Sequence, residues 1–217
     1  MKLSTLLKLT PGDRVAVVGC GGKTALIDRL ALEAAESGVL IAPTTRIGLD
    51  QMMDKPGIAY LGRAEGSKLC AVPLEEILAA SKEYALTLME ADGSAGLPLK
   101  GWASHEPVVP SFATMTIGVV SARAVGLAAI PQNAHRLPLF LAQSGLSEGY
   151  IVDEAAVARM IGRCMERNGM GRKAILINQA DNPGLCAVAG RIARLLDRFE
   201  GLILIGSLRE GGTWSVN

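Results

Sequence analysis

This sequence has few aromatic residues, almost no net charge and no cluster of cysteines. Phe, Trp and Tyr make up 4% of the 217 residues and hydrophobic residues 49%, so the core has to be built mainly from Ala, Leu, Val and Ile. The formal net charge is +1 at pH 7, and the charged residues form no long run of one sign. Because nucleic-acid-binding domains usually carry a basic surface, this composition argues against a nucleic-acid partner.

The cysteines are few and lie far apart, without a C-x-x-C pair. They are Cys20, Cys70, Cys164 and Cys186. This spacing argues against a zinc site and against a disulfide framework. It is typical of buried thiols in a reducing cytosol.

Long uninterrupted apolar runs are also missing. The apolar stretch 114–130 contains Ser121 and Arg123, which argues against a membrane span. The apolar run within residues 1–11 is interrupted by Lys8 and is too short for a signal peptide. We therefore expect a soluble cytoplasmic protein with no membrane partner.

What the sequence does contain is a regular alternation of apolar runs and helical stretches, typical of a mostly parallel sheet covered by helices. We predict one α/β domain over residues 1–217, with three layers and a P-loop-like architecture. The region 132–148 is a candidate for a small helical lid. The expected strands are 15–18, 39–42, 85–89, 114–120, 173–177 and 202–205, and the expected helices are 24–37, 74–80, 153–167 and 183–199.

The first predicted strand runs into a glycine-rich loop, and a predicted helix follows. The loop reads Gly19-Cys20-Gly21-Gly22-Lys23-Thr24. Glycines let consecutive backbone N–H groups curl around an anion, and the start of the helix adds its positive dipole end. Lys23 is then expected to bind the β and γ oxygens of a nucleotide, and Thr24 to bind Mg²⁺.

The loop has the short form GxxGK[ST], which resembles the loop of Mur-type peptide ligases. The alternative is a glycine-rich strand-to-helix turn with a chance Lys-Thr pair. Cys20 is either a small loop residue or a low-pKa thiol at a helix N-terminus.

The predicted strand 85–89 ends in a pair of carboxylates that can complete a magnesium site. Alternation along the chain puts Glu90 and Asp92 on the same side of the strand end. We expect Asp92 to hold the metal and Glu90 to orient a water or act as a general base. The alternative is that one of the two carboxylates only caps the loop through backbone amides. After the second strand, Thr45 can reach the metal and Arg46 the phosphates, or both belong to an ordinary turn.

A late strand ends in a candidate site for the nucleotide base. The segment 178–181 resembles the Asn-Lys-x-Asp motif of GTPases, with Asn178 and Asp181 in place and Gln179 where the lysine stands. An aspartate there accepts hydrogen bonds from guanine that adenine cannot donate. GTP is thus favoured slightly over ATP, and a plain Asn/Asp turn is the alternative.

The long loop 92–110 and the segment after it carry the two histidines of the chain. His105 and Glu106 lie in the loop, where a substrate can bind. His135 is followed by Arg136, and this pair is a candidate second anion site. A solvated surface pair is the alternative.

Together these segments resemble the YqeC family over nearly the whole chain. The segments are 17–24, Ile41-Ala42-Pro43-Thr44-Thr45, Glu90-Ala91-Asp92-Gly93-Ser94, His105-Glu106-Pro107-Val108-Val109-Pro110, His135-Arg136 and 178–181. The resemblance implies an accessory protein for selenium-dependent molybdenum hydroxylases, with such an enzyme or its cofactor as partner. Gln179 and Pro43 depart from the expected patterns and bear on the identity of the nucleotide.

The function expected from the sequence is Mg²⁺-dependent binding and hydrolysis of GTP or ATP, with Lys23, Glu90 and Asp92 as catalytic residues. Two alternatives remain open. One is a phosphoryl-transfer or ligase-type enzyme that takes a second small substrate. The other is a non-catalytic module that uses nucleotide to order its loops.

Overall fold

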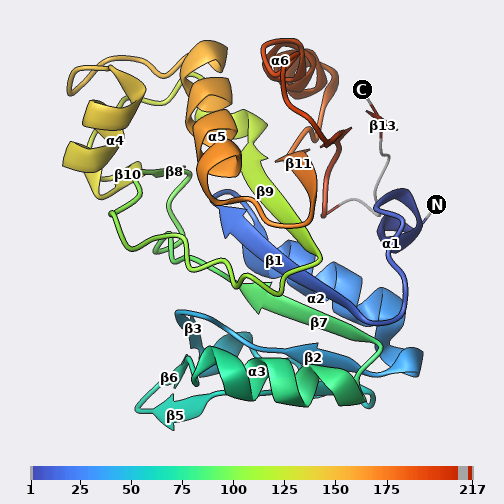
Figure 1. Cartoon of the computed structure of the whole chain (residues 1–217). Helices are drawn as coiled ribbons and strands as arrows, with labels where there is room; N and C mark the ends of the chain where they lie inside the picture. The colour runs from blue at the N-terminus through green and yellow to red at the C-terminus, as the bar shows by residue number, and fades with distance from the viewer. Residues whose placement is uncertain (1, 210–214, 217) are drawn as a thin grey trace.

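A single eight-stranded sheet runs through the computed structural model, which describes residues 2–209 and 215–216 (Figure 1). The strand order is β13-β12-β11-β9-β1-β7-β2-β4. Seven of these strands are parallel, and β13 pairs antiparallel with β12. The expected α/β class with a mostly parallel sheet is confirmed.

The elements follow one another in the order that the alternation predicted. The helices are α1 (Leu3–Leu6), α2 (Lys23–Ala34), α3 (Leu74–Ala80), α4 (Leu137–Ser144), α5 (Glu154–Asn168) and α6 (Pro183–Arg194). The strands of the large sheet are β1 (Asp13–Gly19), β2 (Val39–Ile41), β4 (Ile58–Tyr60), β7 (Leu86–Glu90), β9 (Met115–Ser121), β11 (Arg172–Asn178), β12 (Leu202–Ile205) and β13 (Ser215–Val216). Each predicted strand and helix is present, with ends shifted by a few residues.

Helices cover both faces of the sheet, which confirms three layers. The strand period of two sends alternate residues of β1 to opposite faces. Val15 and Val17 pack in one buried cluster with Leu26 of α2, whereas Ala16 and Val18 join the cluster that contains α5 and α6. Figure 1 shows α2 on one side of β1, with α5 and α6 on the other.

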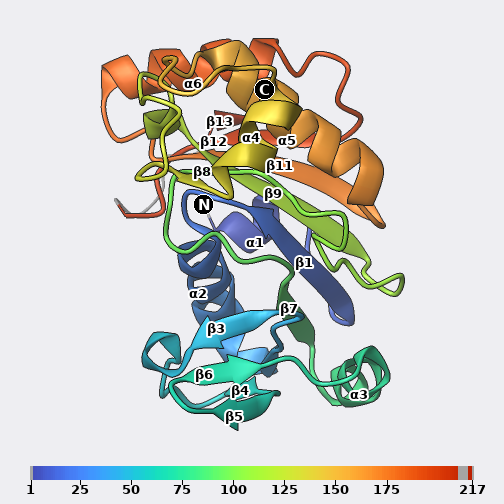
Figure 2. The same ribbon diagram turned by 90° about the vertical axis from the view of Figure 1, so that its left-hand side faces the viewer.

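A small second sheet was not predicted from the sequence. β3 (Arg46–Gly48), β5 (Arg63–Glu65) and β6 (Lys68–Cys70) pair antiparallel. Each strand has three residues, too short for alternation to be recognised. In Figure 2 this sheet lies at the end of the molecule that carries α3, beyond β7.

The region 132–148 contains β10 (Ala134–His135) and α4. β10 pairs with β8 (Leu99–Lys100) and so fixes the loop that follows β8. α4 packs against β8, β10 and α5. Within residues 2–209 and 215–216, no helix is long and apolar enough to cross a membrane.

The order of the strands places the carboxyl ends of β1, β7, β9 and β11 along one edge of the sheet. β1 lies between β7 and β9, and the chain fills the sheet on one side of β1 before it crosses to the other. Ligands of parallel α/β sheets bind at such a reversal. The glycine-rich loop leaves β1 at this point.

Candidate functional site

Glycine is required at three positions of the loop between β1 and α2. Gly19, Gly21 and Gly22 have φ values of 102°, 91° and 131°, which side-chain-bearing residues rarely adopt. A Cβ on Gly19 would lie 2.2 Å from the carbonyl oxygen of Val119, and a Cβ on Gly22 would lie 2.3 Å from Asn178 Nδ2. The loop therefore lies directly against the ends of β9 and β11.

The loop leaves the start of α2 open. Gly22 is the N-cap residue and offers no side chain to the first N–H groups of the helix. By contrast, Asp153 caps α5 and Asn182 caps α6, each through a side-chain oxygen. Uncapped N–H groups at a helix start need an acceptor from elsewhere, and a phosphate fits that need.

Lys23 lies at the centre of the site and is buried. Its Nζ donates to the carbonyl oxygen of Gly19 at 3.0 Å and to Ser94 Oγ at 3.3 Å. It also lies 3.4 Å from Asp92 Oδ1 and 3.6 Å from Glu90 Oε1. Burial opposes the charged ammonium, but the two carboxylates outweigh it and raise the pKa of Lys23. Lys23 is thus held as a cation beside the loop.

Glu90 and Thr24 face each other across the same cavity. Thr24 Oγ1 donates to Glu90 Oε2 at 3.3 Å, and both residues line the cavity. Burial raises the pKa of Glu90, while the nearby Lys23 acts against this rise. The hydroxyl and the carboxylate together place side-chain oxygens on the wall of the cavity beside the loop.

Asp92 lies deeper than Glu90, and its oxygens already have donors. Its carboxylate accepts from the Gly19 N–H at 3.1 and 3.2 Å and from Trp102 Nε1 at 2.7 Å. Lys23 and Lys100 lie on either side of it, and Asp92 is fully buried. This geometry makes Asp92 a support for the loop and for two lysines.

Asp92 belongs to a chain of alternating charges that runs inward from the loop. Lys100 Nζ lies 3.2 Å from Asp92 and 2.9 Å from Glu106, and its side chain is completely buried. Burial acts to raise the pKa of Glu106, but Arg136 and Lys100 outweigh it and lower that pKa. The chain contains three carboxylates and three cations in alternation, which are Glu90, Lys23, Asp92, Lys100, Glu106 and Arg136.

The predicted second anion site at His135 and Arg136 is occupied by the protein itself. Both terminal guanidinium nitrogens of Arg136, Nη1 and Nη2, donate to the carboxylate of Glu106. Burial, with Arg136 and Lys100 nearby, lowers the pKa of His135 and favours the neutral ring. His105 is exposed on the loop.

Lys100 and Trp102 were missed in the sequence, although both contact Asp92. A lysine and a tryptophan inside the segment Leu97-Pro98-Leu99-Lys100-Gly101-Trp102 were a usable signal, because a charge there has to find a buried partner.

The cavity at the loop has a volume of about 550 Å³. The loop and α2 form one wall, the segment 93–96 another, and the small antiparallel sheet a third. Arg46 and Lys68 add positive charge from the small sheet. The Thr45 hydroxyl is buried and has no hydrogen-bond partner within the described part of the chain.

Asn178, at the end of β11, connects the glycine loop to the segment that follows β12. Asn178 Nδ2 donates to the Gly21 carbonyl oxygen at 2.8 Å, and Asn178 Oδ1 accepts from the Leu208 N–H at 3.1 Å. Gln179 lines the cavity. Asp181 pairs with Arg123 and accepts from Ser207 Oγ at 2.6 Å, which lowers the pKa of its carboxyl.

Cys20 is an inert member of the loop. Its thiol donates to the Pro98 carbonyl oxygen at 3.0 Å, and burial raises its pKa to about 12. A thiolate is the reactive form of cysteine, so of the two interpretations of Cys20 the structure favours the small loop residue.

Comparison with known proteins gives one family. The family model described as "YqeC protein" matches residues 15–138, more than half of the chain. The chain belongs to the YqeC family. A YqeC relative, "Uncharacterized protein YqeC" of Escherichia coli (strain K12), is 30% identical over 156 residues. That match covers 61% of this chain and 61% of the relative, so the chain spans about three fifths of the curated relative's length. The YqeC match contains the whole charge chain from Lys23 to Arg136.

Proposed function

We propose that this YqeC protein binds a purine nucleoside triphosphate with Mg²⁺ and hydrolyses it. The observation that carries the proposal is the glycine loop at the start of α2. Its glycines cannot carry side chains, its helix has no side-chain cap, and Lys23 is held beside it as a cation. A triphosphate supplies the acceptor that these N–H groups lack.

For the metal, the oxygen ligands of Thr24 and Glu90 fit Mg²⁺. This ion is usually bound through one or two carboxylates together with substrate phosphates and waters, and not by a full protein cage. Consistent with that, the described residues contain no group of three or more His, Cys, Asp or Glu that could hold a metal by itself. Bound Mg²⁺ would neutralise charge on the β and γ oxygens. We assign the metal to Glu90 and Thr24 and a supporting role to Asp92.

For the base of the nucleotide, the proposal favours guanine over adenine, and so GTP over ATP. Asp181 follows the strand next to the loop, and a carboxylate there can accept from the N–H groups of guanine. To do so it has to exchange its Arg123 or Ser207 partner for the base. Gln179, which already lines the cavity, can supply an amide to either purine.

For the process, the family resemblance favours a step in the maturation of selenium-dependent molybdenum hydroxylases. The resemblance alone supports this part of the proposal, since the name of the curated relative assigns no activity.

Calorimetric titration with GTP and with ATP, each with and without Mg²⁺, tests the binding. We expect one nucleotide to bind with an affinity that rises when Mg²⁺ is present. Absence of heat from both nucleotides would refute the proposal. Phosphate release under the same conditions then separates a hydrolase from a module that only binds.

A matched pair of variants controls the titration. Lys23→Met removes the cation beside the loop, and Lys82→Met removes a cation from an exposed position outside the cavity. Only Lys23→Met should weaken binding strongly. Equal affinities in the two variants would place the nucleotide elsewhere.

A further inference from the structure

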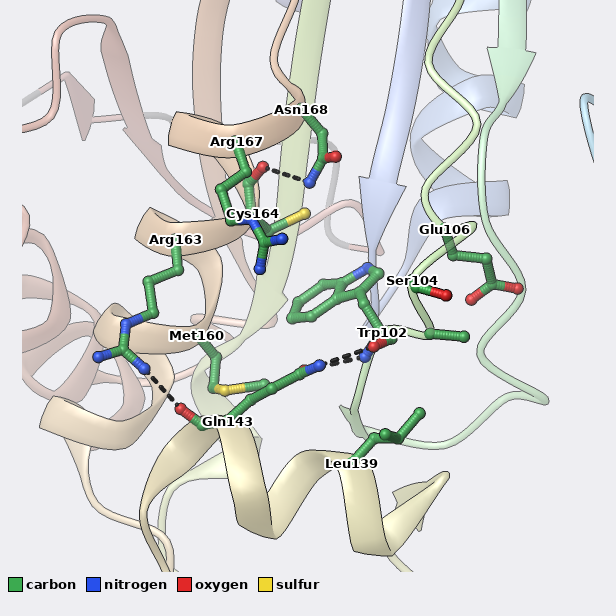
Figure 3. Close-up of a pocket in the computed structure, with 11 residues that line it drawn as sticks. Trp102, Ser104, Glu106, Leu139, Gln143, Met160, Arg163, Cys164, Arg167 and Asn168 are labelled. Carbon is green, nitrogen blue, oxygen red and sulfur yellow. Dashed lines mark hydrogen bonds between the residues drawn. The ribbon is translucent and has the colours of Figure 1, made fainter.

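A second cavity lies on the other side of Asp92. It has a volume of about 380 Å³ and is enclosed by the segment 102–106, α4 and α5 (Figure 3). Its walls and those of the cavity at the glycine loop have no residue in common. A ligand in it would therefore contact none of the residues that line the cavity at the loop.

Trp102 forms a fixed aromatic wall of this cavity. Its backbone N–H donates to Gln143 Oε1 at 3.0 Å, and its carbonyl oxygen accepts from Gln143 Nε2 at 2.6 Å. Its indole N–H donates to Asp92 at 2.7 Å. With backbone and indole edge both held, the ring needs no reordering to receive a ligand, which lowers the entropic cost of binding.

Two arginines of α5 line the same cavity as Trp102 and bring positive charge to it. Arg163 and Arg167 are four residues apart on α5 and so lie on one face of the helix. Neither forms an ion pair with a carboxylate of the described residues. Arg163 makes one hydrogen bond, to the Gln143 carbonyl oxygen at 2.9 Å. In Figure 3 the guanidinium of Arg167 points toward the Trp102 ring.

The acidic residue at the rim does not cancel this charge. Glu106 lines the cavity, but its carboxylate is paired with Lys100 and Arg136. The site thus combines an aromatic face with two guanidinium groups, whose donors match a phosphate geometrically.

We propose that this cavity binds a second ligand, a flat aromatic molecule that carries a phosphate monoester. The ring stacks on Trp102, and the phosphate takes the donors of Arg163 and Arg167. Because Trp102 and Lys23 share Asp92, occupancy of this cavity changes the affinity at the loop. The last part rests on the proposed nucleotide site, whereas binding in the second cavity does not.

The test uses 4-nitrophenyl phosphate as probe and Trp102 fluorescence as signal. The chain has two tryptophans, so Trp214→Phe leaves Trp102 as the single emitter. Without nucleotide or Mg²⁺, we expect saturable quenching after correction for probe absorbance. Neutral 4-nitrobenzyl alcohol should quench weakly. Arg163→Ala and Arg167→Ala should each weaken the probe about tenfold, as expected for a lost charge-assisted hydrogen bond.

Two controls separate this site from the loop and from general charge. Arg194→Ala removes an exposed arginine of α6 that does not line the cavity, and Lys68→Met removes a cation that lines only the cavity at the loop. Both should bind the probe like the parent protein. Quenching that does not saturate, that is equal for the neutral analogue, or that disappears in Lys68→Met would overturn the proposal.

Coupling between the cavities is tested with Trp102→Phe, which keeps a ring but loses the indole N–H. By calorimetry, the probe should still bind this variant within a few-fold of the parent. A probe effect on nucleotide affinity should be present in the parent and absent in Trp102→Phe. The same probe effect in both proteins would refute the route through Asp92 and leave the nucleotide site itself intact.

Discussion

The cavity at the glycine loop and the cavity at Trp102 are built in opposite ways. The cavity at the loop uses backbone N–H groups and buried charges, which come from the loop, from α2 and from the end of β7. The cavity at Trp102 uses side chains from a loop and two helices, with its arginines exposed at the surface. Asp92 accepts hydrogen bonds from the Gly19 N–H of the loop and from the indole N–H of Trp102, and so links the two.

Because of this difference, we expect substitutions at the two sites to affect different properties, folding stability at the loop and ligand affinity at Trp102. Buried charges at the loop are held by other buried charges, so removing one leaves its partner unpaired in a medium of low polarity. The arginines at Trp102 keep contact with water, so their loss changes ligand affinity and has little effect on folding.

Substitution of Asp92, which is bonded to both sites, should have the largest effect on stability. Asp92→Asn leaves Lys23 and Lys100 with one shared counter-charge fewer, and we expect a loss of about 3–5 kcal/mol in the free energy of unfolding. Urea denaturation measures it. Asp197→Asn, at an exposed position, is the control and should leave stability unchanged. A stable Asp92→Asn protein that has lost only its Mg²⁺ dependence would return the metal role to Asp92.

Lys23 tests the loop cavity by itself. Lys23→Met should weaken nucleotide binding by about 100-fold, since charge-assisted hydrogen bonds to phosphate contribute roughly 1.5–3 kcal/mol each. Calorimetry measures the affinity, and circular dichroism at the same temperature checks the fold. A variant that binds as tightly as the parent would refute the phosphate loop.

The glycines test whether the loop tolerates side chains. Gly22→Ala puts a Cβ 2.3 Å from Asn178 Nδ2 at a φ of 131°, and we expect a loss of about 1–3 kcal/mol in stability. Gly93→Ala is a matched control, because Gly93 lines the same cavity and an added Cβ meets no atom within 4 Å. Equal melting temperatures of the two variants would contradict this account of the loop.

Substitution of Glu90 tests the proposed Mg²⁺ site, and the Mg²⁺-dependent nucleotide affinity should vary with pH. Its pKa is raised by burial, so the carboxylate becomes neutral and loses Mg²⁺ at a higher pH than an ordinary glutamate. The gain in nucleotide affinity from Mg²⁺ should therefore decline as the pH falls through this raised pKa. Glu90→Gln should reduce that gain about tenfold above this pKa, roughly the contribution of one charged ligand, and should change it little below this pKa. A parent-like Mg²⁺ titration of Glu90→Gln would exclude Glu90 as a ligand.

Asp181 should give the smallest effect, because its carboxylate is already paired near the surface. Asp181→Asn should lower GTP affinity several-fold and favour xanthosine triphosphate, whose carbonyl replaces the guanine amino group. Competition binding with the two nucleotides and ATP measures the preference. If the parent protein prefers ATP, Asn178 and Asp181 only shape the loop and the turn before α6.

The sequence by itself determined the sheet, its helices and the glycine loop. These are local features, in which apolar period, helix caps and glycine spacing act between residues close along the chain. It also placed Glu90, Asp92 and Asn178 at one edge, since parallel strands bring their carboxyl ends together.

Only the tertiary structure decided what each charged residue does. Glu90 and Asp92 are two residues apart, yet one faces the cavity and the other is enclosed by Gly19, Trp102 and Lys100. Arg136 is paired with Glu106, while Arg163 and Arg167 line one cavity with Trp102 because the fold brings α5 over a distant loop. Burial and pairing set the roles of such groups, and both depend on contacts between residues far apart in the chain.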